Sequence, residues 1–404
     1  MPEAMEQNEK NILVVTCFGH FVCHFNMLVF PALVLPLTLT SGLDIAGVLG
    51  LSFWMYLLFG ITALPWGLVA DRWAPRPLMM LMFLGAGLSS LAAAWLVDQP
   101  DQFSLALAGI GLFSGIYHPA GLGLISKSVR RVAMAMGYNG IFGNLGLATA
   151  PLMAGIMNWV GGPRAAYVAL GLVNLGGLVL MFKAPPVEVK LNSVGNASKN
   201  GGLWTPFLVL LVAMMLGGVA YRGSSVIMPT LLQLKSPQII GFLEGLWPGH
   251  LPANLVATII TSVLYALGMV GQYVGGRTGE RFDPRLGYFW FHLAAIAPAM
   301  LMGLASDWTL SGLGILYLFF LLGMQPMENT LVARLSPDAW RHSAYGLKFV
   351  FTFGVGSLAV KGVGWVQQAW GLEWVFPCLG VVSIGIVAAV AVLLKLTRPV
   401  EKTS

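Results

Sequence analysis

Arg222 is a charged residue inside a long apolar run of this 404-residue chain, and no acid stands in the same run to neutralise it. A charge inside a bilayer is costly, so it needs a partner or a function. A guanidinium at such a place is well suited to holding an anionic or polar group of a substrate. The alternative is a structural charge bonded to backbone carbonyls or to a polar partner such as Asn26. We predict that Arg222 binds substrate.

Glu328 and Lys348 form a second candidate site. Glu328 is expected about five residues before the end of one apolar helix and Lys348 about five residues after the start of the next. The two are therefore expected at similar depth on adjacent helices, where they could form an ion pair. Such a pair is either purely structural or a proton switch in which protonation of Glu328 releases Lys348. Both readings stay open at this point.

Three histidines stand in apolar runs as well. His20 and His24 are four residues apart and share a helix face, and His118 lies on another predicted helix. Histidine changes its charge near neutral pH, which suits proton coupling. The alternative is a hydrogen-bonded core histidine. Three imidazoles could also ligate a transition metal, but nothing in the sequence brings them together, so we predict no metal site and no cofactor.

The composition requires a membrane. Hydrophobic residues make up 57% of the chain and charged residues 9%, against roughly 25% charged in soluble domains. At about 20 apolar residues per span, the sequence predicts an all-α membrane protein with twelve helices. They are expected at residues 11–40, 45–68, 77–97, 103–126, 133–160, 165–183, 206–234, 252–275, 286–305, 309–332, 344–367 and 373–396.

Lysine and arginine predict the orientation of these helices. With both termini in the cytoplasm, seventeen basic residues fall in cytoplasmic segments and only two, Arg164 and Lys235, in outer loops. The net charge of +6 is therefore a topology signal and indicates no nucleic-acid partner. Residues 184–205 are polar and rich in Gly, Asn and Ser, which is typical of a linker. We expect six-helix bundles at 1–183 and 206–404, in a bacterial inner membrane.

The stretch GLVADRWAPR, Gly67–Arg76, recurs as GGRTGERFDPR, with Glu280-Arg281 standing 209 positions after Asp71-Arg72. The same offset relates glycines throughout the two halves, which indicates a duplicated unit. Both copies resemble the signature loop of the major facilitator superfamily, although Ala74 and Pro75 depart from its pattern.

This resemblance implies two pseudo-symmetric bundles that work by alternating access, as a monomer. It further implies a conformational latch on the cytoplasmic side, for which the candidates are Gly67, Asp71, Arg72, Arg76, Glu280 and Arg281. In the superfamily the first, fourth, seventh and tenth helices line the substrate path. The polar side chains of those helices, with Asn139 of the fifth, are the candidate substrate-binding residues: His24, Asn26, Tyr117, His118, Asn139, Tyr221, Arg222 and Gln325.

The predicted fifth helix carries small residues and a proline at regular spacing. Gly137, Gly146, Pro151 and Gly155 resemble the antiporter motif of the superfamily's drug exporters, with alanine replacing two of its glycines. Such residues allow close helix approach, and the proline bends the helix. The stretches HFVCHFNMLVFPALVLPL, YHPAG and YRGSSVIMP resemble the fosmidomycin-resistance type of bacterial exporter.

Together these features predict a secondary transporter, not an enzyme. We expect proton-coupled export of a small amphipathic or anionic compound, with Glu328, Lys348 and His118 as proton-coupling candidates. No phosphate-binding G-x4-G-K-[ST] is present, so ATP drive within this chain is not expected. The alternative is a proton-coupled importer of a metabolite anion. A transporter-shaped sensor or a lipid scramblase is the other class left open.

Overall fold

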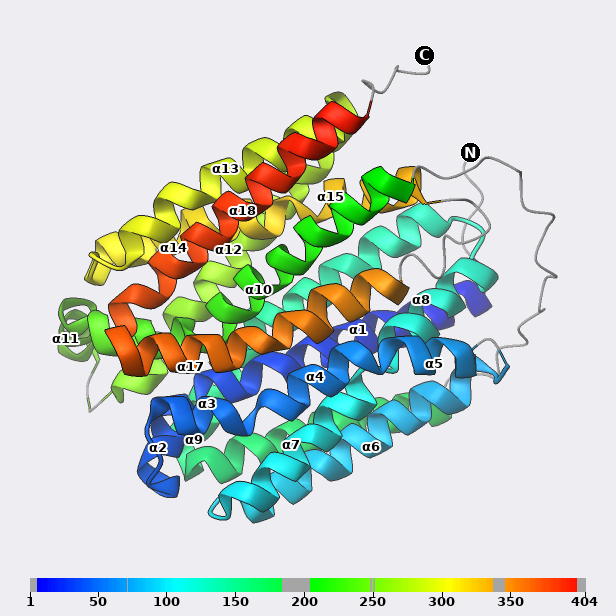
Figure 1. The fold of residues 1–404 in the computed structure, drawn as a ribbon. Helices are drawn as coiled ribbons and strands as arrows, with labels where there is room; N and C mark the ends of the chain where they lie inside the picture. The colour runs from blue at the N-terminus through cyan, green and yellow to red at the C-terminus, as the bar shows by residue number, and fades with distance from the viewer. Residues whose placement is uncertain are drawn as a thin grey trace. The chain divides into compact units, whose positions relative to one another are not determined.

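The computed structural model describes residues 6–70, 72–183, 204–247, 249, 251–336 and 346–397, apart from the side chains of Lys127 and Ala133. All regular structure in these residues is helical (Figure 1). Long apolar runs must satisfy their backbone polar groups internally when lipid surrounds them, and helices do so. The chain divides into two compact units, Met1–Gly195 and Asn196–Ser404. The predicted linker lies outside the described residues, except for Trp204 and Thr205, which begin a helix.

The first unit is built around α1, which packs along α9. Its other close pairs are α6 with α7, α6 with α9, and α4 with α7. Its elements are α1 (Gln7–Ala32), α2 (Val34–Ser41), α3 (Ile45–Leu51), α4 (Phe53–Ile61), α5 (Ala63–Ala70), α6 (Pro75–Leu96), α7 (Pro100–Ser114), α8 (Tyr117–Ser128) and α9 (Val132–Lys183).

The second unit packs α18 between α10 and α13, and α12 against α14. Its elements are α10 (Trp204–Lys235), α11 (Pro237–Leu246), α12 (Ala253–Arg281), α13 (Pro284–Met302), α14 (Asp307–Gly323), α15 (Gln325–Leu335), η2 (Val350–Gly354), η3 (Val355–Ser357), α17 (Leu358–Trp370), η4 (Leu372–Trp374) and α18 (Val375–Leu396). The short helix α11 stands where the sequence predicts only an outer loop.

Ten helical stretches of the described chain are long and apolar enough to cross a membrane. One of them includes both the fifth and the sixth predicted helices, because α9 continues across a kink at Gly161 and Gly162. The two glycines leave helical geometry there, Gly162 with a φ of 70°, which a residue with a Cβ adopts only at a cost. The 19-residue α13 supplies the ninth predicted helix. With the double stretch counted as two and α13 added, the described chain contains all twelve predicted helices.

The fourth and tenth predicted spans are each interrupted before a proline. The fourth breaks after Ser114, and Pro119 lies in the first turn of α8. The tenth breaks at Met324, and Pro326 lies in the first turn of α15. Proline lacks the backbone N–H that a continuous helix needs, but it fits a first turn, where that donor has no helical partner. The repeat therefore places the polar starts of α8 and α15 in equivalent positions.

The eleventh predicted span is described from Gly346 and is not a regular helix. A π-helical turn, η2, and a 3₁₀ turn, η3, precede α17. Gly218 of α10 lies against η2 so closely that an added Cβ would stand 2.0 Å from the carbonyl oxygen of Thr352. Single π turns in helices are often found at functional sites. This one begins two residues after Lys348.

Candidate functional site

The first unit brings His20, His24 and His118 together. One ring nitrogen from each lies within 4.8 Å of the others. His20 and His24 come from one face of α1, and their Nε2 atoms are 3.0 Å apart. His118 comes from the first turn of α8, and its ring centroid lies 5.4 Å from those of both other histidines. The sequence contains no signal for this cluster, because the break before α8 and the rotation of that helix toward α1 cannot be read from spacing.

His20 is held in place by α8 and α9. Its Nδ1 donates to the backbone carbonyl of Asn139 at 2.8 Å, and its ring stacks on Tyr117 with centroids 4.9 Å apart. The Asn139 amide donates to the Tyr117 hydroxyl at 2.7 Å, and that hydroxyl donates to the carbonyl of Thr16 at 2.8 Å. Buried networks whose members are bonded are rigid. Tyr117 and Asn139, predicted as substrate-binding residues, thus position His20.

Asn26 lies in a separate buried network between α1 and α9. Its Nδ2 donates to Ser114 at 2.9 Å, and its Oδ1 accepts from Asn174 at 2.8 Å. Nδ2 of Asn26 also donates to Oδ1 of Asn174 at 3.2 Å. This reciprocal amide pair fixes the packing of the two helices. Substrate binding by Asn26 stays a prediction.

In the second unit Glu328 and Lys348 form the expected ion pair. Lys348 Nζ lies 2.7 Å from Glu328 Oε1, and both side chains are buried. The other carboxylate oxygen, Oε2, accepts from the hydroxyl of Tyr288 at 2.9 Å. Nζ also donates to the side-chain oxygen of Asn329. The buried carboxylate and ammonium thus have partners on three separate segments. Charges buried away from water need such pairing and hydrogen bonding to offset the cost of desolvation.

Arg222 is buried on α10, at 2% exposure. Its guanidinium carbon lies 5.7 Å from the ring centroid of the neighbouring Tyr221. Gln325, at the start of α15, accepts from Gln272 of α12 at 2.6 Å. The roles of Arg222, Tyr221 and Gln325 in binding substrate stay predictions.

The antiporter-like residues lie on α9, and part of the motif faces α1. An added Cβ at Gly146 would stand 2.2 Å from the carbonyl oxygen of Phe21. Ala150 and Ala154 on the same helix are fully buried, as expected for a tight helix contact. Gly137 differs, because an added Cβ there would meet no atom within 4 Å. Pro151 and Gly155 are buried within the helix.

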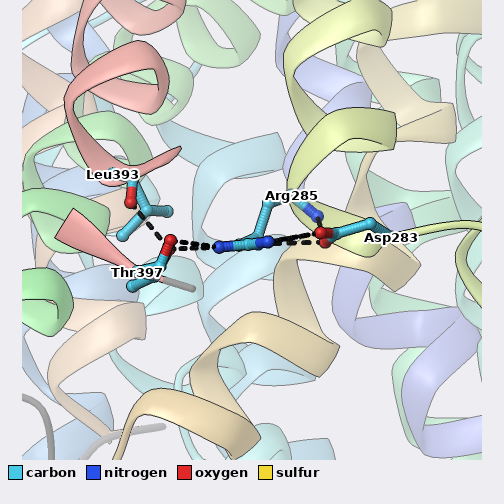
Figure 2. A network of polar contacts seen from close by, with 4 residues as sticks. All are labelled: Asp283, Arg285, Leu393 and Thr397. Atoms are coloured by element: carbon cyan, nitrogen blue, oxygen red, sulfur yellow. Dashed lines mark hydrogen bonds and ion pairs between the residues drawn. The ribbon is translucent and has the colours of Figure 1, made fainter. Parts of the chain in front are cut away.

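The last residues of the two copies of the signature loop make similar contacts. Arg76, at the start of α6, donates to the carbonyl of Met181 near the end of α9 at 3.0 Å. Arg285 stands 209 positions later, at the start of α13. It donates to the carbonyl and hydroxyl of Thr397, which follows α18, and pairs with Asp283 (Figure 2). Each arginine joins the start of one helix to the end of another within its own unit.

Asp283 illustrates the electrostatics of this contact. Partial burial raises the pKa of its carboxyl, but the hydrogen bonds and charge of Arg285, with the charge of Arg334, outweigh burial and leave the pKa below its ordinary value. Asp71, by contrast, lies outside the described residues, so the latch stays a prediction. Of its other residues, Arg72, Glu280 and Arg281 are exposed, and a Cβ added at Gly67 would make only ordinary contact with Pro119.

Sequence reasoning missed several partners of these sites. Arg285 could have been found, because the repeat offset that defines the second loop copy leads to it from Arg76. Tyr288 and Asn174 carry no such signal, because a buried hydroxyl or amide among apolar residues does not reveal which helix it faces.

The sequence profile described as Major Facilitator Superfamily matches residues 16–359. The chain belongs to the Major Facilitator Superfamily. It is 27% identical over 153 residues to a "Probable L-galactonate transporter" of Escherichia coli (strain K12), covering 36% of this chain and 33% of that protein. It is 26% identical over 185 residues to "Tetracycline resistance protein, class B" of Escherichia coli, covering 44% of each. The matched region is thus less than half of either relative.

Among solved structures, a bacterial homologue of the human lysosomal transporter Spinster, inward-facing and occupied, aligns with a TM-score of 0.77 and 13% identity over 98% of each chain. At this identity the likeness shows the fold alone. The chain therefore has the fold of superfamily secondary transporters and is an integral membrane protein. The family and its structural neighbours are transporters, not enzymes.

Proposed function

We propose that this chain is a proton-coupled antiporter that exports a small amphipathic or anionic compound across a bacterial inner membrane, with both termini in the cytoplasm. The observation that carries the proposal is the buried Glu328–Lys348 ion pair. Proton coupling needs a group that gains and loses a proton inside the protein and moves a partner when it does so. A carboxylate paired with an ammonium meets both needs, because protonation removes the attraction between them.

The cycle follows from the contacts of Glu328. A proton that reaches Oε1 replaces the ammonium of Lys348 as its partner, while Tyr288 retains Oε2. Lys348 then keeps Asn329 but loses its counter-charge. The segment that bears Lys348 continues into the π turn η2, which packs on Gly218 of α10. Loss of the ion pair thus changes how the eleventh span is held against α15, which shifts the balance between conformations.

The proposal of export, as opposed to import, is supported by the small residues of α9. Gly146 permits the close approach of α9 to α1, and the spacing of small residues around Pro151 resembles the motif of drug exporters. A tetracycline resistance protein is among the relatives, which agrees with export. The second candidate is proton-coupled import of a metabolite anion. Buried Arg222 would bind an acidic group, and another relative is named as a probable L-galactonate transporter.

The test begins with a thermal-shift screen of the purified protein against anions and antibiotics at two pH values, because a bound compound stabilises the fold. Tetracycline and fosmidomycin are included as probes. Each stabilising compound is then added to inside-out membrane vesicles whose interior has been acidified. Antiport predicts that the compound collapses the pH gradient. If the compound instead enters right-side-out vesicles only under an inward proton gradient, import replaces export.

A further inference from the structure

The histidine cluster in the first unit has the composition of a metal centre. Its members are His20, His24 and His118, with one nitrogen from each within 4.8 Å of the others. His20 and His24 are only half-buried, and His118 is 6% exposed. The residues sit on two helices, with α1 supplying two ligands at a four-residue spacing. That spacing places two imidazoles on one helix face, as in helical zinc sites.

The hydrogen bonds of His20 determine which of its nitrogens is available. The backbone carbonyl of Asn139 can only accept, so Nδ1 of His20 carries the proton of that 2.8 Å bond. Its Nε2 is then the unprotonated nitrogen of a neutral imidazole. A metal-binding histidine characteristically donates its other ring N–H to a carbonyl or carboxylate, which fixes the tautomer and the ring orientation. His20 already has this arrangement.

The separation between nitrogens also suits an ion. Nε2 of His24 lies 3.0 Å from Nε2 of His20. Two ligands of a tetrahedral zinc ion, each with a bond of about 2.0–2.1 Å, stand about 3.3 Å apart. Since Nε2 of His20 has no proton, Nε2 of His24 donates to it in the structure. Metal binding would require His24 to carry this proton on Nδ1 instead, in the other tautomer of the neutral imidazole. The ligand nitrogen of His118 lies within 4.8 Å of the other two.

The type of ligand selects the type of ion. Imidazole nitrogens suit zinc, copper, nickel and iron, whereas magnesium and calcium require oxygen ligands. The group contains no carboxylate among the described residues. Three protein ligands leave one position of a tetrahedral ion for water or for a donor atom of another molecule. We propose that His20, His24 and His118 form a binding site for a divalent transition-metal ion, with zinc as the best fit.

Two glycines of α9, Gly143 and Gly140, differ in their distance from the ring of His20 and so allow a test of the site's geometry. An added Cβ at Gly143 of α9 would stand 2.6 Å from the ring of His20, whereas one at Gly140, a turn earlier, would meet nothing within 4 Å. Gly143→Ala therefore displaces the His20 ring without removing an imidazole. Gly140→Ala makes the same chemical change on the same helix and leaves the ring in place.

The experiment measures zinc binding to the purified full-length protein, after removal of any histidine tag, by competition with a chromophoric chelator. We expect one zinc ion per chain and no competition from magnesium. His24→Ala and His118→Ala should each weaken binding by more than about 100-fold, the upper end of the loss caused by removing an outer partner of a ligand. Gly143→Ala should weaken it by at least about 10-fold.

His292→Gln is the matched imidazole control, because it removes a fully buried histidine of the second unit. It and Gly140→Ala should retain the affinity of the unmodified protein. Equal zinc affinity in His118→Ala, His24→Ala and the unmodified protein would place the ion elsewhere and overturn the proposal. So would the absence of stoichiometric binding, or equal losses in Gly143→Ala and Gly140→Ala. None of these results depends on the direction of transport.

Discussion

Glu328→Gln should destabilise the second unit strongly, because it leaves the ammonium of Lys348 buried without its counter-charge. Lys348 Nζ and Glu328 Oε1 lie 2.7 Å apart, and the side chains of Lys348 and Glu328 are 9% and 4% exposed. Removing one partner of a buried ion pair costs about 3–5 kcal/mol. For a unit of this size that is a fall of roughly 6–20 °C in the unfolding temperature. Lys348→Met should have a similar effect, because it leaves the carboxylate unpaired.

The double variant Glu328→Gln/Lys348→Met should recover most of the lost stability, because replacing both members of a buried pair is often neutral. Thermal unfolding of the purified variants in detergent measures all three changes, and the double-mutant cycle isolates the coupling between the two residues. Glu373→Gln is the matched control, because that glutamate is exposed. If the single variants have the same unfolding temperature as the control, or if their losses of stability simply add in the double variant, the ion pair does not stabilise this unit.

Other predictions test the remaining sites. Gly146→Ala should destabilise the first unit by about 1–3 kcal/mol through overpacking, because its Cβ would lie 2.2 Å from the α1 backbone. Gly137→Ala, whose Cβ would meet nothing within 4 Å, should be neutral. Equal effects of the two variants in thermal unfolding would contradict the packing argument. Asp283→Asn should destabilise the protein at pH 6. The difference should shrink as the pH falls from the ordinary Asp pKa of 3.8 through the lower folded-state pKa, because a lowered pKa contributes stability that is full only above the unfolded value; a difference that does not shrink at all on acidification would count against this. Cysteine at Asp98 should react with an impermeant thiol reagent from outside, and labelling from inside would reverse the topology. Asp71→Asn should slow transport strongly while substrate affinity stays within a few-fold; spin-label distances across the cytoplasmic face that match the unmodified protein, alongside lost transport, would exclude a latch.

Apolar length predicted the membrane helices, since it is a property of the chain itself, and the resemblance of the signature loop implied their arrangement in two six-helix bundles. The repeat offset leads from Arg76 to Arg285, although the predicted latch did not include Arg285. Equal depth on adjacent helices was enough to predict that Glu328 could pair with Lys348. Depth does not determine rotation about a helix axis. For that reason the sequence could not show that His118 turns toward α1 or that Asn26 pairs with Asn174, 148 positions away.

Proton coupling through Glu328 is the central claim, and one measurement on reconstituted vesicles tests it most directly. Substrate exchange is recorded without a gradient and net transport is recorded with a pH gradient, for the unmodified protein, Glu328→Gln and Glu373→Gln. We predict that Glu328→Gln retains exchange but that its net transport no longer responds to the gradient, while Glu373→Gln behaves as the unmodified protein. Net transport by Glu328→Gln that still follows the pH gradient would contradict the account and place the proton site elsewhere, with His118 as the next candidate.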